Sequence, residues 1–277
     1  VLNENDNAYV DVTDNLTFLK DNSFIWTSEK DSFNHIYLYD KTGKLKNQVT
    51  KGNWEVTNYY GFDEKSATVF YQSVENGSIN RDVYRIQLDG KNKVRLTSQT
   101  GTNAATFSPN FQYFINSFSS ATTAPTYTLN ESKSGAVIKT IVSNEAVETK
   151  LAKYEVTPKE FFVLTTEKGH QLNAWMIKPK NFDATKKYPL LVENHGGPIL
   201  NYGDRFTAEI QLYAADGFVV FYPNPRGSTS YGEEFGNLLK NNYPGQDYND
   251  VMDGVDYLVD NGIADNDKLF VTGGSAG

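Results

Sequence analysis

The sequence predicts a partial β-propeller followed by part of an α/β sheet. Two observations carry this prediction. Short segments of aromatic and β-branched residues recur at a regular interval in residues 1–150, whereas strand-like and helix-like segments alternate in residues 151–277. We therefore expect two domains in the 277 residues, with the boundary at about residue 150.

The first half repeats itself at an interval of 47 residues. This interval separates Tyr37 from Tyr84 and Thr50 from Thr97, and a weaker third copy places Tyr127 43 residues after Tyr84. Each copy consists of short strand-like segments separated by turn residues such as Gly, Asn and Asp. A repeat of roughly 40–50 residues with four short strands is typical of a propeller blade. A β-sandwich with accidental internal similarity is the alternative.

The same repeats lead us to expect a fragment of a longer protein. A propeller typically needs at least four blades to close, and only three copies are present. The chain begins at Val1 without an initiator Met or a targeting segment, and it ends at Gly277 within a motif that should lead into a helix.

The second half alternates in the order of a parallel α/β sheet. A hairpin is expected first, then a buried strand, a helix, a second buried strand, a longer amphipathic helix and a third buried strand. The corresponding ranges are 160–165 with 171–177, 188–193, 207–216, 217–222, 247–261 and 268–272. Parallel crossovers between the three buried strands follow from this order.

Composition excludes several classes of function. Lys and Arg number 26 against 34 Asp and Glu, so the net charge of −8 gives no overall attraction to nucleic acid. No apolar run approaches the roughly 18 residues of a membrane helix. The chain has no Cys, which excludes cysteine nucleophiles and thiolate metal sites and leaves the compartment undetermined. We predict no nucleic-acid partner and no membrane segment; the oligomeric state stays open.

The last predicted strand runs directly into Gly273-Gly274-Ser275-Ala276-Gly277, which matches the motif G-x-S-x-G. In an α/β-hydrolase this motif holds a nucleophilic serine on a strained bend between strand and helix, where its Oγ is exposed. Because the motif follows an α/β pattern here, we predict that Ser275 is a nucleophile in the first part of an α/β-hydrolase domain. A plain glycine-rich turn is the alternative.

A second glycine motif, His195-Gly196-Gly197-Pro198, follows an earlier predicted strand. Acyl transfer passes through an oxyanion, which two preorganised N–H groups can stabilise. We predict that these donors are the backbone N–H groups of Gly197 and Ala276. A tight turn without a catalytic role is the alternative.

The chain has no histidine after Ser275, where the catalytic base of this fold would lie in the sequence. In this fold the triad runs Ser, Asp, His along the chain, yet His35, His170 and His195 all precede Ser275. We expect the first two to be structural and His195 to order its own loop by hydrogen bonding. The triad Asp and His should therefore lie beyond Gly277, and the isolated chain should be inactive.

Two further features receive structural interpretations. We expect Arg226 to pin neighbouring loops rather than to bind substrate. The acidic residues of the second predicted helix, which suggest a metal cluster, are spaced by three and should form a solvated helix face: Asp247, Asp250, Asp253 and Asp256.

These motifs together resemble those of the prolyl oligopeptidase family of serine peptidases. The likeness covers essentially the whole chain and is carried by residues 26–29, 51–57, 195–198, 224–232 and 272–277. Residues before about 190 look like bacterial dipeptidyl peptidase IV. Later residues look like the acylaminoacyl-peptidase branch, because Gly274 and Ala276 flank the serine where dipeptidyl peptidase IV usually shows an aromatic residue and a Tyr.

The resemblance implies a serine peptidase that hydrolyses short peptides near their N-terminus through an acyl-enzyme on Ser275, with Ala276 and Gly197 lining the oxyanion hole. A propeller would restrict access to short peptides, no metal or organic cofactor would be needed, and a periplasmic or secreted location is suggested. The glutamate pair that grips a free N-terminus in dipeptidyl peptidase IV would lie upstream of Val1. The alternatives are an α/β-hydrolase esterase and a propeller binding module with an inactive hydrolase domain.

Overall fold

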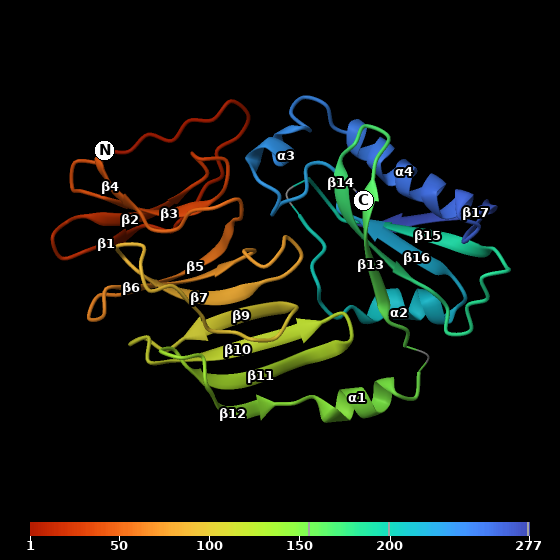
Figure 1. The fold of residues 1–277 in the computed structure, drawn as a ribbon, viewed down its shortest axis with the longest axis horizontal. Coiled ribbons are helices and arrows are strands. Elements are labelled where there is room, and N and C mark those ends of the chain that lie inside the picture. The colour runs from red at the N-terminus through yellow and green to blue at the C-terminus, as the bar shows by residue number, and fades with distance from the viewer. Residues whose placement is uncertain (155, 199, 276) are drawn as a thin grey trace. The chain divides into compact units, whose positions relative to one another are not determined.

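The computed structural model describes residues 1–154, 156–198, 200–275 and 277. Two compact units contain these residues (Figure 1). The first unit comprises Val1–Ser120, Pro125–Ser143 and Ser230–Asn237. The second unit comprises Ala121–Ala124, Asn144–Thr229 and Leu238–Gly277.

The first unit contains three antiparallel sheets of four strands, each built from strands consecutive in the chain. The first sheet holds β1 (Thr17–Phe18), β2 (Phe24–Ser28), β3 (His35–Tyr39) and β4 (Leu45–Gln48). The second holds β5 (Val56–Asp63), β6 (Thr68–Ser73), β7 (Asp82–Gln87) and β8 (Val94–Arg95). The third holds β9 (Thr102–Phe107), β10 (Tyr113–Ser120), β11 (Thr123–Glu131) and β12 (Val137–Val142). This is the architecture of propeller blades, as the repeat predicts.

The repeated tyrosines occupy equivalent places in the three sheets. Tyr37 lies on β3, Tyr84 on β7 and Tyr127 on β11, and each of these is the third strand of its sheet. The repeat in the sequence therefore corresponds to a repeat in the structure.

Aromatic and branched side chains fill the core of the first unit. The buried rings of Tyr71 and Tyr84 stack with their centroids 5.5 Å apart, and Trp54 stacks on the other side of Tyr71 at 6.3 Å. His35 is fully buried beside them, with Nδ1 3.1 Å from Thr50 Oγ1 and Nε2 2.9 Å from the carbonyl of Gly52. His35 is thus structural, as predicted.

The first unit also contains a polar cavity of about 330 Å³ with several carboxyl groups in its lining, namely Glu4, Asp6, Asp11, Glu29 and Glu233. Burial raises the pKa of Glu29 to about 7, and the negative charges of Glu55, Asp11 and Asp6 add to this effect. The cavity therefore holds a carboxyl group that exchanges its proton near neutral pH.

We predict that Glu29→Gln makes the stability of the protein less dependent on pH. Unfolded Glu29 titrates at its ordinary pKa of 4.5, so between pH 4.5 and about 7 the folded state holds a proton that the unfolded chain has lost. The contribution of Glu29 to stability is therefore present at low pH and disappears as the pH rises through this window. At pH 8 the variant should be more stable than the parent by about 1–3 kcal/mol.

Urea unfolding at pH 4 and pH 8 measures this effect, and Glu234→Gln is the matched control because Glu234 is exposed on the first unit. An equal response of the two variants to pH would contradict the prediction.

The second unit contains a five-stranded sheet of order β13-β14-β16-β15-β17. Its strands are β13 (Lys159–Thr165), β14 (Gln171–Ile177), β15 (Tyr188–Asn194), β16 (Val219–Pro223) and β17 (Ala264–Gly273). Strands β13 and β14 form the predicted hairpin, β14 pairs antiparallel with β16, and β15 pairs parallel with both β16 and β17. The predicted α/β order is confirmed.

Four helices complete the described structure: α1 (Glu145–Leu151), α2 (Ala208–Ala215), α3 (Glu233–Asn237) and α4 (Gln246–Asp260). Helix α4 turns Val255 and Leu258 into the core. Gly254 lets α4 approach the sheet closely, because a Cβ there would lie 2.3 Å from the ring of Phe221 on β16. The described residues include no helix long and apolar enough to cross a membrane.

The expectation that residues 268–272 form a buried strand is wrong in one respect. The strand exists as the central part of β17, but its side chains are largely exposed, including Phe270 at 50% and Val271 at 70%. The apolar run predicted burial on both faces, whereas β17 is the last strand in the sheet order and pairs with β15 on one side. The segments that pack on the faces of a strand, rather than its composition alone, decide its burial.

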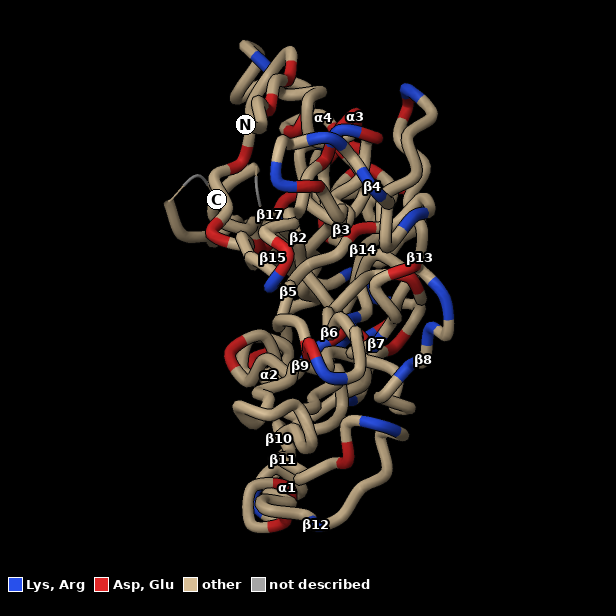
Figure 2. Tube along the Cα trace, turned by 90° about the vertical axis from the view of Figure 1, so that its left-hand side faces the viewer, with Lys and Arg blue, Asp and Glu red and all other residues tan. Residues whose placement is uncertain are grey.

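Charged residues are distributed over many segments of the trace, as Figure 2 shows. Short basic and acidic stretches alternate along the chain. The absence of a nucleic-acid partner stays a prediction.

Candidate active site

The candidate nucleophile lies on a strained turn at the end of β17. This strand ends at Gly273, and Ser275 two residues later has a φ of 59° and is exposed. The left-handed region is unfavourable for a residue with a Cβ, so the surrounding structure must hold Ser275 there. The turn has the geometry that G-x-S-x-G predicts for a nucleophile elbow.

Close packing requires the first and last glycines of this motif. A Cβ on Gly273 would lie 2.5 Å from the carbonyl carbon of Gly277 and 2.8 Å from the carbonyl oxygen of Asn194 at the end of β15. A Cβ on Gly277 would lie 2.2 Å from that same oxygen. A Cβ on Gly274, by contrast, would meet nothing within 4 Å. The two outer glycines thus let the elbow fold back onto β15.

The His195–Pro198 segment follows β15 and lies directly beside the elbow. A Cβ on Gly196 would stand 3.5 Å from the Cβ of Ser275 and 2.7 Å from the carbonyl oxygen of Gly274. Gly197 is half-buried, with open space where a side chain would be. The two segments that the sequence assigns to one site are therefore neighbours. Ala276, the second predicted N–H donor, lies outside the described residues.

His195 forms a hydrogen bond with a serine of the neighbouring loop. Its Nε2 lies 3.0 Å from the hydroxyl of Ser228 in the loop after β16. Burial lowers the pKa of His195, so the imidazole is neutral at neutral pH. The prediction that this histidine orders its loop is confirmed, and its partner is a serine that the sequence did not single out.

A buried ion pair anchors the same loop. The Nε of Arg226 lies 2.8 Å from Oδ2 of Asp250, its terminal nitrogen lies 2.5 Å from Oδ1, and its backbone N–H donates to Oδ2 at 2.9 Å. Arg226 is 5% exposed and Asp250 is 0% exposed. Arg226 is therefore the structural pin that we predicted.

The interpretation of the acidic residues on α4 as a solvated face is wrong for Asp250. At 100° per residue, a spacing of three moves each successive residue around the helix by 60°, so the series crosses from one side to the other. Asp256 is exposed, but Asp250 faces the interior, where Arg226 neutralises it. Within the described residues no cluster of three or more metal-ligating side chains is present.

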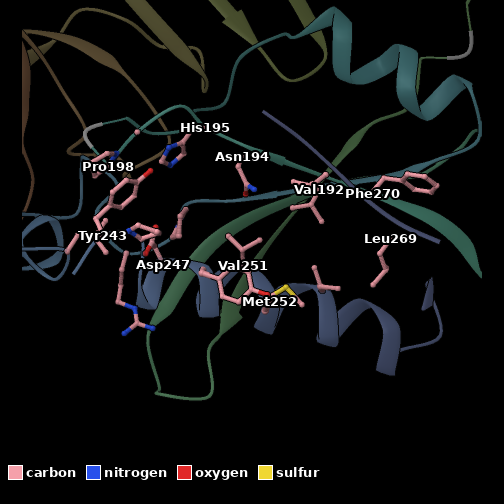
Figure 3. Close-up of a pocket in the computed structure, with 18 residues that line it drawn as sticks. Val192, Asn194, His195, Pro198, Tyr243, Asp247, Val251, Met252, Leu269 and Phe270 are labelled. Atoms are coloured by element: carbon pink, nitrogen blue, oxygen red, sulfur yellow. The ribbon is translucent and has the colours of Figure 1, made fainter. Parts of the chain in front are cut away.

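A cavity of about 410 Å³ in the second unit adjoins the His195–Pro198 segment. Figure 3 shows its apolar walls, with Val251 and Met252 on α4 facing the strands that carry Val192 and Leu269. Asn194, His195 and Pro198 also line it (Figure 3). Ser275 is not among the residues that line this cavity.

The fold and this site together define a propeller-type unit joined in one chain to an α/β-hydrolase elbow. Residues 1–125 match the family described as dipeptidyl peptidase IV N-terminal region, and residues 204–277 match the prolyl oligopeptidase family. These matches are to prolyl oligopeptidase-family peptidases, and the chain is similar to dipeptidyl peptidase IV in both of its parts.

Individual relatives agree with this assignment. An uncharacterized peptidase of Bacillus subtilis, YuxL, is 32% identical over 78% of this chain and 30% of its own length. Dipeptidyl peptidase 4 of Trichophyton rubrum is 27% identical over 92% of this chain and 34% of its own. The crystal structure of Porphyromonas gingivalis dipeptidyl peptidase 4 superposes with a TM-score of 0.91 at 35% identity, over 97% of this chain and 38% of that one. The chain thus spans about a third of the length of these relatives.

Proposed function

We propose that Ser275 is the nucleophile of a serine peptidase that hydrolyses short peptides. The observation that carries this proposal is the positive-φ turn at Ser275, directly beside Gly196 of the second glycine motif. An exposed serine on a strained bend next to a glycine-rich loop is suited to acyl transfer.

In the proposed reaction Ser275 Oγ attacks the scissile carbonyl and forms an acyl-enzyme, which water then hydrolyses. The backbone N–H groups of Gly197 and Ala276 would stabilise the oxyanion. His35 and His195 are engaged elsewhere, so we infer that the base and the acid that orients it come from outside these 277 residues. The chain on its own would then be inactive. We also propose that residues 1–150 are propeller blades and residues 151–277 begin the hydrolase domain.

The substrate class that we propose rests on the names of the relatives and not on the shape of a binding pocket. Several of them are named dipeptidyl peptidases, which supports an enzyme that acts near the N-terminus of short peptides. We propose an aminopeptidase or oligopeptidase of this kind.

Labelling with a fluorophosphonate tests the proposed nucleophile in the protein at the full length of its relatives. The probe should react with Ser275, and Ser275→Ala should lose all labelling and all hydrolysis of dipeptidyl-amide substrates. Ser73→Ala is the matched control, because Ser73 is buried in the first unit, on β6. Labelling at another serine, with Ser275 untouched, would refute the assignment.

A further inference from the structure

Two buried side chains of the loop after β16 hold the segment that follows β15 at both ends. Asn224 accepts a hydrogen bond from the backbone N–H of Tyr202 at 2.8 Å and donates to its carbonyl at 3.0 Å. Ser228 meets Nε2 of His195 at 3.0 Å. Asn224 and Ser228 are both fully buried. His195, which opens the predicted oxyanion loop, and Tyr202 are therefore both fastened to the neighbouring loop.

The direction of the hydrogen bond between Ser228 and His195 can be deduced. The Ser228 hydroxyl donates its single proton to the carbonyl of Pro225 at 2.7 Å. Toward His195 it can therefore only accept, so the proton of that bond belongs to Nε2 of the imidazole. Burial lowers the pKa of His195, which keeps the ring neutral. One tautomer, protonated at Nε2, is selected.

The loop that carries Ser228 is itself rigidly held. The ion pair of Arg226 with Asp250 fixes it from α4, and the backbone N–H of Ser228 donates to the carbonyl of Pro225 at 3.1 Å. The hydroxyl therefore stands at a fixed point, and the ring of His195 must orient toward it. Because Gly196 follows His195 directly and packs against Ser275, the orientation of that ring bears on the spacing between the loop and the nucleophile.

We propose that Ser228 is a positioning residue for catalysis at Ser275. It fixes the tautomer and the orientation of His195, and through them it holds the backbone N–H of Gly197 where the oxyanion forms. This role rests on the proposed function, since it presupposes that Ser275 reacts. A displacement of about 1 Å in such a donor can cost up to roughly 100-fold in rate.

The test compares Ser228→Ala with the control Ser73→Ala, again in the protein at the full length of its relatives. Ser228→Ala should lower kcat by roughly 10-fold to 100-fold while KM changes little, because the lost interaction serves the transition state. Ser228→Cys, which nearly keeps the volume but is a weak acceptor, should lose activity to an intermediate degree and covers the case in which the alanine variant fails to fold. Ser73→Ala should keep the parent kcat.

A spectroscopic measurement separates positioning from general stability. Nitrogen-15 NMR of histidine-labelled protein, with the His195 signals assigned from His195→Gln, should show protonation at Nε2 in the parent and a mixture of tautomers in Ser228→Ala or Ser228→Cys. A parent-like tautomer and parent-like kcat in these variants would overturn the proposal. If Ser275 is unlabelled in the parent, the proposed function fails; if it is labelled and the Ser228 variants react at the parent rate, this role alone fails.

Discussion

Asp250→Ala is expected to lower the free energy of unfolding by about 3–5 kcal/mol, which is the usual cost of removing one partner from a buried ion pair. The variant would leave the Arg226 guanidinium 5% exposed and without its carboxylate. It would also remove the acceptor of the Arg226 backbone N–H. Urea denaturation monitored by circular dichroism measures the loss.

The same helix provides the control. Asp256→Ala removes an exposed carboxylate from α4 and should change the free energy of unfolding by less than about 0.5 kcal/mol. A double variant, Arg226→Met with Asp250→Leu, should be more stable than Asp250→Ala, because it leaves no charge unpaired. If Asp250→Ala and Asp256→Ala unfolded at the same urea concentration, the prediction would be wrong, because the Arg226–Asp250 ion pair would then not stabilise the protein.

The sequence predicted the sheets of the first unit because a blade is a local structure. Its strands are consecutive in the chain and pair through short turns. Each blade therefore corresponds to one continuous segment, and the blades appear as a repeat in the sequence. Tyr37, Tyr84 and Tyr127 lie on the third strand of their sheets for this reason. The strands of each blade could therefore be predicted without contacts between segments distant in the chain.

Burial in the second unit could not be predicted in the same way. The exposure of Phe270 depends on which segments of these 277 residues pack over β17, and nothing within residues 268–272 encodes that packing. The burial of Asp250 depends on Arg226, which lies 24 residues earlier in another element. Both outcomes arise from contacts between segments that the chain brings together only on folding.

The candidate site was predictable to the extent that it rests on topology. The carboxyl ends of parallel strands lie at the same edge of a sheet, so motifs that follow β15 and β17 had to be neighbours. The contact between Gly196 and Ser275 agrees with this rule. Ser228 follows β16 at the same edge, but its role required the distance to His195, because a serine in a loop has no distinguishing pattern.

Gly273→Ala is expected to slow the labelling of Ser275 by a fluorophosphonate roughly 100-fold, in the protein at the full length of its relatives. The new Cβ would stand 2.8 Å from the carbonyl oxygen of Asn194 and 2.5 Å from the carbonyl carbon of Gly277. These are backbone atoms that no side-chain rotation can move, so the elbow itself must shift and carry Ser275 with it.

Gly274→Ala is the matched control, since it makes the same chemical change one residue further along the motif. Its Cβ would meet nothing within 4 Å, and its backbone is outside the left-handed region. The labelling rate should therefore fall far less than in Gly273→Ala, although Gly274 is the nearer of the two to Ser275 in sequence. Equal losses in both variants would show that the motif tolerates no side chain for reasons other than packing against β15. A loss confined to Gly273→Ala would establish that contact with the end of β15 holds the serine in its strained conformation.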